Sequence, residues 1–272
     1  MQSLSQANHY RKLLAEFPEQ TADFNRFINR PEAALKESRV FFATALENAS
    51  VLCDETEPLK NGLQRLKEVE LLAGPLVYIS LTHHQENRFG GGNYAKAGLK
   101  PDGLELLRHL HGRKIAIDLS HTSDKLAEDI INALEKHSLD VPLIASHSNF
   151  RQVWEQPRNL PGDFVKEIVR REGIIGINFV RKFVHETNPG ALLEHIAHGL
   201  QINDGNTLCL GSDFFYTAVL EASRHPVFFD EHAHAGKIPL VLQQLQQAGI
   251  STAQIEKFSY GNALRYLQRV FG

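Results

Sequence analysis

The sequence has few of the features that mark secreted, membrane-bound or nucleic-acid-binding proteins. It holds only two cysteines, Cys53 and Cys209, too few and too far apart for a disulfide scaffold or a cysteine zinc knuckle. No run of 18 apolar residues occurs and the start has no apolar signal core, so we expect no membrane segment. The net charge is only −3 and no basic run is present, so no nucleic-acid partner is expected. These absences favour a reducing, cytoplasmic location.

What is present fits a soluble globular protein. The 272 residues are 42% hydrophobic and 22% charged, which is ordinary for a folded domain. We expect one domain over residues 1–272, with a polar, helical N-terminal segment at 1–38. The 14 histidines are more than a chain of this length usually carries.

Short apolar runs alternate with longer segments of helical spacing along the chain. Such alternation predicts parallel strands joined by helical crossovers, and therefore an α/β fold. Two architectures are consistent with this pattern, a doubly wound sheet and a (β/α)8 TIM barrel. The predicted strands are residues 39–47, 76–83, 114–121, 141–147, 173–179 and 207–213.

The residues at the strand ends favour the barrel. Five of the six predicted strands finish in a residue that can bind a metal or move a proton, namely Glu47, His83, His121, His147 and Asp213. In a barrel the carboxyl ends of all strands converge on one mouth, whereas an open sheet spreads them along an edge. The three glycines at 90–92 do not open a helix with dinucleotide-binding spacing. Six strands instead of eight indicate a barrel that lacks its first two strands.

Two histidines at consecutive strand ends predict a metal site. His121 and His147 can reach one ion because neighbouring strands lie about 4.8 Å apart. Imidazole and carboxylate are ligands that zinc accepts. Glu47 is therefore interpreted as a ligand or a salt-bridged carboxylate, and Asp213 as a ligand, a proton carrier or a turn-stabilising residue.

The remaining polar residues carry weaker predictions. Of the pair at 83–84, we expect His83 to face the mouth and His84 to be packed or solvated. Arg158 is either a solvent-exposed arginine or a clamp for a substrate carboxylate. Asp118 is left outside the site, and a ligand role for the pair at 232 and 234 is disfavoured. The histidines in helical or loop stretches are expected at the surface, namely His109, His111, His137, His185, His195 and His198.

Taken together, these motifs resemble the membrane dipeptidase (renal dipeptidase-like, peptidase M19) family. The matching segments are ISLTHHQENRFGGG, IAIDLSHTS, LIASHSNFRQVWEQPRNLP, LCLGSDF and YGNALRYLQRVF, covering about residues 39–272. The resemblance implies a (β/α)8 barrel with two zinc ions that hydrolyses dipeptides by metal-activated water, often with a D-residue at the C-terminal position.

The resemblance also implies a role for each site residue. Glu47 would bridge the metals, while His121 and His147 would complete one metal site. Asp213 would bind the other metal and exchange protons. His83 would stabilise the oxyanion, and Arg158 would hold the substrate's carboxylate.

One family motif has no counterpart in this chain. The family's first strand ends in a His-x-Asp pair, and no such pair precedes Glu47. We therefore expect a chain that begins at the third strand, binds at most one zinc tightly, shows little or no activity, and is poorly soluble or oligomeric because of its open strand edges. The alternatives are an impaired homologue that binds metal or a small ligand, another amidohydrolase-like barrel, and a non-enzymatic scaffold.

Overall fold

A computed structural model describes residues 2–34 and 36–272 of the chain. Contacts within the chain divide it into two compact units. Unit 1 comprises Met1–Pro142 and Leu267–Gly272, and unit 2 comprises Leu143–Tyr266. The candidate site residues are therefore divided between the two units, and Glu47, His83 and His121 lie in unit 1.

The N-terminal part of unit 1 is mainly helical and also contains short strands. Its elements are α1 (Gln2–Glu16), β1 (Thr21–Asp23), α2 (Phe24–Asn29), α3 (Pro31–Ala34) and β2 (Val40–Phe42). β1 pairs in parallel with β2, with Thr21 opposite Val40. The strand predicted over 39–47 is accordingly split, since β2 pairs with β1 while β3 (Thr44–Glu47) pairs with β4 (Leu76–Ser80). The three residues of β1 were missed because they do not form an apolar run.

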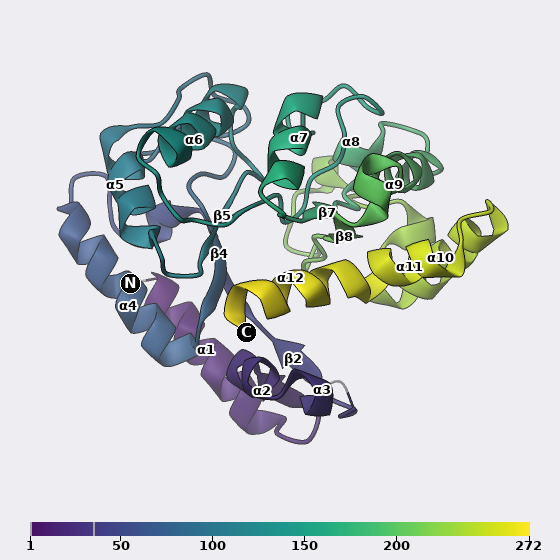
Figure 1. The fold of residues 1–272 in the computed structure, drawn as a ribbon, viewed down its shortest axis with the longest axis horizontal. Helices are drawn as coiled ribbons and strands as arrows, with labels where there is room; N and C mark the ends of the chain where they lie inside the picture. Colours follow the sequence, from purple (N-terminus) through teal and green to yellow (C-terminus); the bar gives the residue numbers. More distant parts are fainter. Residues whose placement is uncertain (1, 35) are drawn as a thin grey trace. The chain divides into compact units, whose positions relative to one another are not determined.

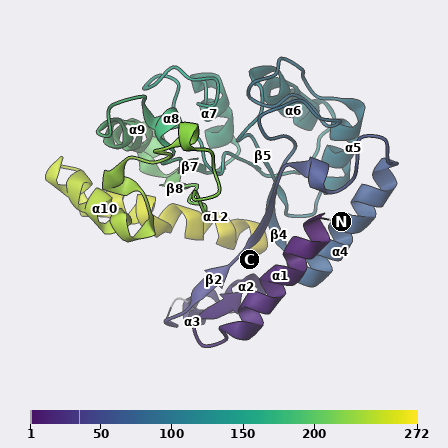
Figure 2. The same cartoon turned by 180° about the vertical axis from the view of Figure 1, so that it is seen from behind.

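The sheet of unit 1 carries the first candidate residues. It runs β3, β4, β5 (Ala116–Asp118), with all neighbours parallel. Its helices are α4 (Leu59–Ala73), α5 (Pro101–Leu110) and α6 (Asp124–Lys136), and η1 (Ala49–Val51) follows β3. Figures 1 and 2 both show α1 lying along α4. The loops after β3, β4 and β5 begin at the carboxyl ends of three neighbouring strands. The predicted ligands of unit 1 lie at these strand ends.

Helix α6 shows how the sequence sets these crossovers. The Ser123 side chain caps the helix by accepting a hydrogen bond from the Leu126 backbone N–H. Leu126, Ile130 and Leu134 recur at a spacing of four and are buried. The same spacing predicted the helix from sequence. The capped start of α6 fixes the position of the backbone just after His121.

Unit 2 repeats the alternation of parallel strands and helices. Its strands are β6 (Leu143–Ile144), β7 (Ile175–Ile177) and β8 (Leu208–Leu210). Its helical elements are α7 (Gly162–Arg170), α8 (Arg181–Val184), α9 (Ala191–Leu200), η2 (Ile202–Gly205), η3 (Ala222–Arg224), η4 (Asp230–His232), η5 (Ala235–Lys237), α10 (Ile238–Gln247), α11 (Thr252–Glu256) and η6 (Lys257–Gly261). The final helix, α12 (Asn262–Phe271), ends in the residues assigned to unit 1.

The strand ends of unit 2 pack closely. β7 pairs in parallel with β8, and Ala145 just after β6 bridges Ile175 in parallel. A Cβ added at Gly176 would lie 2.0 Å from the Ser146 carbonyl oxygen, so glycine is required where these backbones meet. This close approach brings the residues that follow β6, β7 and β8 within hydrogen-bonding reach of one another.

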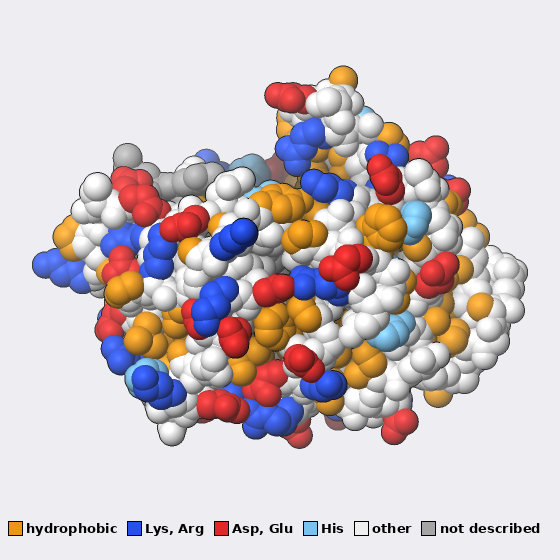
Figure 3. All heavy atoms as spheres, turned by 90° about the horizontal axis from the view of Figure 1, so that it is seen from above, with side chains coloured by type: hydrophobic (Ala, Val, Ile, Leu, Met, Phe, Trp, Pro, Cys, Tyr) orange, Lys and Arg blue, Asp and Glu red, His pale blue; other side chains and the backbone are white. Residues whose placement is uncertain are grey.

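The charged side chains at the surface and the two cysteines can be compared with the composition. Acidic and basic side chains alternate over the face shown in Figure 3. Cys53 and Cys209 are buried free thiols, and burial raises the pKa of Cys209 to about 12. None of the helices in the described residues has the length and hydropathy that crossing a membrane requires.

Candidate metal centre

Unit 1 brings three of the predicted site residues together. Glu47, the last residue of β3, places Oε1 2.8 Å from His121 Nε2 and 4.0 Å from His83 Nε2. The His121 side chain is 3% exposed, whereas those of Glu47 and His83 are 42% and 45% exposed. A carboxylate and two imidazoles thus meet at a partly open position, and these donors suit zinc.

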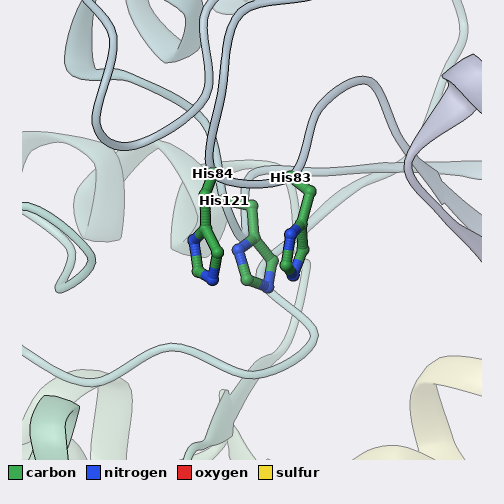
Figure 4. Close-up of side chains that lie close together, drawn as sticks. All are labelled: His83, His84 and His121. Atoms are coloured by element: carbon green, nitrogen blue, oxygen red, sulfur yellow. The ribbon is translucent and has the colours of Figure 1, made fainter. Parts of the chain in front are cut away.

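His84 also lies in this cluster, where it is packed against other rings. Its ring centroid lies 3.9 Å from that of His83 and 4.9 Å from that of His121. Figure 4 shows the three rings side by side. β4 ends at Ser80, so consecutive side chains at 83 and 84 need not point to opposite faces. The sequence did not indicate that His84 would lie beside His83 and His121.

The glycine-rich segment after His84 holds the two histidines in place. Gly92 N–H donates to the Gln85 carbonyl at 3.1 Å, and Gly92 forms an antiparallel bridge with Thr122. A Cβ at Gly92 would lie 2.4 Å from the His83 carbonyl oxygen. The segment therefore needs glycine to sit against the backbone of both the His83 loop and the turn that carries His121.

Backbone conformation also sets the direction of the ligands at strand ends. His121 has φ 70° and Asp213 has φ 57°, both in the left-handed region that non-glycine residues rarely adopt. Asn48, directly after Glu47, has φ 94°. Such conformations persist where the surrounding structure holds them, and they concentrate at functional sites.

In unit 2, a network of amide groups links the other two predicted ligands. Asn178 Nδ2 donates to Asp213 Oδ2 at 3.0 Å and to the His147 carbonyl at 3.3 Å. Asn178 is 1% exposed, and its backbone N–H donates to Asn149 Oδ1 at 3.1 Å. His147 is buried, and its Nδ1 lies 2.6 Å from Ser146 Oγ. Asn178 follows a glycine-containing strand, and sequence reasoning did not single it out.

Arg158 supports the same strand end. Its guanidinium donates from Nη1 to Ser148 Oγ at 2.7 Å and from Nη2 to the His147 carbonyl at 2.8 Å. The residue is 4% exposed and its Cζ lies 5.5 Å from the Phe183 ring centroid. The solvent-exposed alternative for Arg158 is therefore wrong, and a structural role for it in unit 2 is evident.

The structure thus assembles the predicted ligands as two sets. Glu47, His83 and His121 lie together in unit 1, while His147 and Asp213 are joined through Asn178 in unit 2. That both sets share one metal centre stays a prediction from the order of the strand ends.

Three other predictions can be compared with the structure. His195 is fully buried, not at the surface, because it lies on the apolar face of α9 between Leu192 and Gly199. Its Nε2 lies 3.0 Å from the Val184 carbonyl, and burial lowers its pKa to about 4. Asp118 is buried and accepts hydrogen bonds from Ser80 Oγ and the Ser120 N–H, which ties β4 to the end of β5.

Of the histidine pair at 232 and 234, His232 serves the packing of unit 2. It is 3% exposed, and its Nε2 lies 3.2 Å from the Pro189 carbonyl oxygen. Burial lowers its pKa, which keeps the ring neutral near neutral pH.

Comparison with known proteins gives a consistent result. The family model described as membrane dipeptidase (peptidase family M19) matches residues 1–271, so the similarity extends through the N-terminal 38 residues. The chain is 28% identical to dipeptidase verJ of Clonostachys rogersoniana over 202 residues, or 71% of this chain and 48% of the relative. It is also 28% identical to dipeptidase tcpJ of Claviceps purpurea over 201 residues. The chain covers 44% of tcpJ, so it spans about half the length of these two relatives.

Solved structures agree on the fold. A dipeptidase of the metallopeptidase family M19 superposes with a TM-score of 0.82 at 21% identity, covering 99% of this chain and 77% of the other. A metallopeptidase from Rhodobacter sphaeroides, liganded with a phosphinate mimic of the dipeptide L-Ala-D-Ala, gives a TM-score of 0.81 at 20% identity, covering 98% and 74%. The predicted α/β fold of the TIM-barrel type is therefore confirmed.

Proposed function

Because this chain belongs to the membrane dipeptidase family, peptidase family M19, we propose that it is a zinc-dependent hydrolase that cleaves the peptide bond of dipeptides. The observation that carries the proposal is the contact between Glu47 and His121 at the ends of β3 and β5, with His83 beside them. The Rhodobacter sphaeroides relative holds a mimic of L-Ala-D-Ala, which supports a dipeptide with a C-terminal D-residue as one substrate.

The residues that would hold the metal are those that the sequence predicted. Glu47 and His121 supply a carboxylate and an imidazole nitrogen 2.8 Å apart, and His147 and Asp213 are the further ligands. A carboxylate and neutral imidazoles are the donor set of hydrolytic zinc sites. When bound, the metal lowers the pKa of a water towards about 7 and polarises the scissile carbonyl.

The other steps are carried out by side chains of this protein. The Asp213 carboxylate accepts the proton of the attacking water and returns it to the leaving amine. The His83 imidazole donates to the oxygen on which negative charge develops, a role worth about 3 kcal/mol per donor. Arg158 holds the C-terminal carboxylate of the substrate, which limits the substrate to a short peptide.

We further propose a cytoplasmic enzyme that assembles into homo-oligomers. The proposal rests on the two cysteines, which are free thiols, and on the open strand edges at 39–47 and 207–213 that the sequence predicted. Sedimentation velocity over a range of protein concentrations measures the oligomeric state, and a monomer at all concentrations would contradict this part.

The test of the proposed reaction is hydrolysis by the zinc-loaded chain. Purified protein is incubated with L-Ala-L-Ala, L-Ala-D-Ala and their C-terminal amides, and free alanine is quantified by mass spectrometry over long times. We expect slow, zinc-dependent cleavage of the free acids and much weaker cleavage of the amides.

Two variants serve as a matched pair in this assay. Asp213→Asn should remove the cleavage, whereas Asp204→Asn, at an exposed aspartate that also has a positive φ of 53°, should leave it unchanged. Equal rates for wild type and Asp213→Asn, or no cleavage of any dipeptide, would contradict the proposed function.

A further inference from the structure

We propose that His83, His84 and His121 form an alternative metal position in unit 1, with Glu47 as the fourth ligand, which competes with the metal of the proposed function for Glu47 and His121. Each residue of the histidine group offers a ring nitrogen, and these nitrogens all lie within 4.8 Å of one another. This set differs from the one the family implies, since it uses His83 as a ligand and includes His84. It needs no residue of unit 2.

The geometry requires only small movements of side chains. Zinc–nitrogen distances of 2.0–2.1 Å in a tetrahedral site place two nitrogens about 3.4 Å apart. The His83 and His121 ring centroids are 4.2 Å apart, and Glu47 Oε1 already lies 2.8 Å from His121 Nε2. The ring nitrogens, which lie within 4.8 Å of one another, would have to approach to about 3.4 Å to close the site around an ion.

Asn93 orients His84 as a ligand. Asn93 Oδ1 lies 2.9 Å from His84 Nδ1, so Nδ1 carries the proton and Nε2 presents its lone pair to the cluster. Asn93 itself is 5% exposed. Histidines that bind metals characteristically donate their other ring N–H to a fixed acceptor of this kind, and Tyr94 stacks on the ring with centroids 5.1 Å apart.

The position is both supported and accessible. Gly92 packs against the backbone of His83 and His84, and Tyr94 N–H donates to the His84 carbonyl at 3.1 Å. His121 is buried, whereas the His83 side chain is 45% exposed, so an ion can enter from solvent. Figure 4 shows how closely the three rings lie.

The chemistry of the donors selects the metal. Three imidazole nitrogens and one carboxylate favour Zn²⁺, Co²⁺, Ni²⁺ or Cu²⁺ over Mg²⁺ and Ca²⁺, which prefer oxygen ligands. If the proposed dipeptidase reaction holds, an ion at this site also withdraws His83 from the substrate, so excess zinc should inhibit the enzyme.

The test measures metal binding without relying on turnover. Metal-free protein is titrated with Zn²⁺ against a chromophoric chelator and with Co²⁺ by visible absorption. We expect His84→Gln to weaken Zn²⁺ binding at least 10-fold and to change the Co²⁺ spectrum, with a smaller loss in Asn93→Leu. His9→Gln, at an exposed histidine of α1, is the control and should bind like the wild type.

Two further measurements separate this site from the one in the proposed function. His147→Gln should leave the Co²⁺ spectrum of the three-histidine site in place, whereas a site that depends on His147 would lose it. In the unmodified chain, the ¹⁵N resonance of His84 Nε2 should shift on addition of Zn²⁺, a readout that needs no variant to fold. Unchanged affinity in His84→Gln, or an unmoved His84 resonance, would overturn the proposal.

Discussion

The candidate residues of the two units lie at equivalent places, after parallel strands, but are held in different ways. In unit 1, Glu47 and His83 are about half exposed, and the backbone of a glycine-rich segment holds the histidine loop. In unit 2, His147 and Asn178 are buried, and side-chain amide and guanidinium groups hold the strand ends. The exposed side chains of unit 1 can be reached from solvent, whereas the buried side-chain hydrogen bonds of unit 2 fix one geometry.

This difference indicates that the two units contribute differently to the proposed site. The cluster of unit 1 is suited to binding an ion from solvent, because Glu47 and His83 are partly exposed. The fixed network of unit 2 is suited to presenting Asp213 in one orientation, as proton transfer requires.

The largest effect is expected in unit 1 from Glu47→Gln. The substitution keeps the size of the side chain but removes the charge beside His121, so zinc affinity should fall by more than about 100-fold. Equilibrium dialysis with metal analysis measures the change. Glu128→Gln, at an exposed glutamate of α6, is the control. Retained zinc in Glu47→Gln would exclude Glu47 as a ligand.

In unit 2, acid should weaken the fold through His195. Burial lowers the folded-state pKa of His195 to about 4 from its ordinary value of 6.5, so the stability that the neutral ring contributes is complete above pH 6.5 and is lost as the pH falls towards 4. Over that window the loss is about 3 kcal/mol in the free energy of unfolding.

Urea denaturation at pH 7 and pH 5 measures this effect. His195→Gln should be less stable at pH 7 and should lose less stability between the two pH values than the wild type. His9→Gln is the control, since His9 is exposed. An equal pH dependence in wild type and His195→Gln would show that other groups cause the acid sensitivity.

The backbone support of unit 1 is tested by Gly92→Ala. A Cβ there would lie 2.4 Å from the His83 carbonyl oxygen, so we expect a loss of about 1–3 kcal/mol in stability and weaker zinc binding. Gly190→Ala is the control, because the nearest atom to its Cβ is a side-chain oxygen at 3.1 Å. Thermal unfolding and zinc titration of both variants check this. Parent-like zinc affinity in Gly92→Ala would mean that the segment does not position the histidines.

The smallest expected effect is the coupling between Asn178 and Asp213. Asn178→Asp places two carboxylates together, and adding Asp213→Asn restores one amide–carboxylate hydrogen bond with the partners exchanged. We expect the double variant to regain about 1 kcal/mol in the metal-free protein, measured by urea denaturation. Asn262→Asp, at a buried asparagine that donates to Gly205 and Leu208, should gain nothing from Asp213→Asn. Strictly additive effects at 178 and 213 would contradict the hydrogen bond.

Much of the fold could be predicted from the sequence because its strands are apolar runs and its helices have regular spacing. β4 to β8 lie within the predicted runs, although each is shorter. β1 could not be predicted, since a three-residue polar strand is recognised only by its partner. The ends of strands were equally difficult, because where an extended run leaves the sheet depends on the loop that packs against it.

The site could be predicted in part for the same reason. Glu47, His83 and His121 stand out as titratable residues after apolar runs, and the structure places them in contact distance. His84 and Asn178 could not be recognised, because their importance comes from loop geometry and from hydrogen bonds to residues distant in sequence. The buried position of His195 differs from the predicted surface position because apolar residues surround it on α9.

We propose that the strand ends of this chain bind a catalytic metal. Zinc stoichiometry tests this directly and is determined by native mass spectrometry on the purified chain after stripping and reloading. We expect one tightly bound zinc ion per wild-type chain, and none in Glu47→Gln or His121→Gln. A wild-type chain without zinc, or one that keeps its zinc after both substitutions, would contradict it.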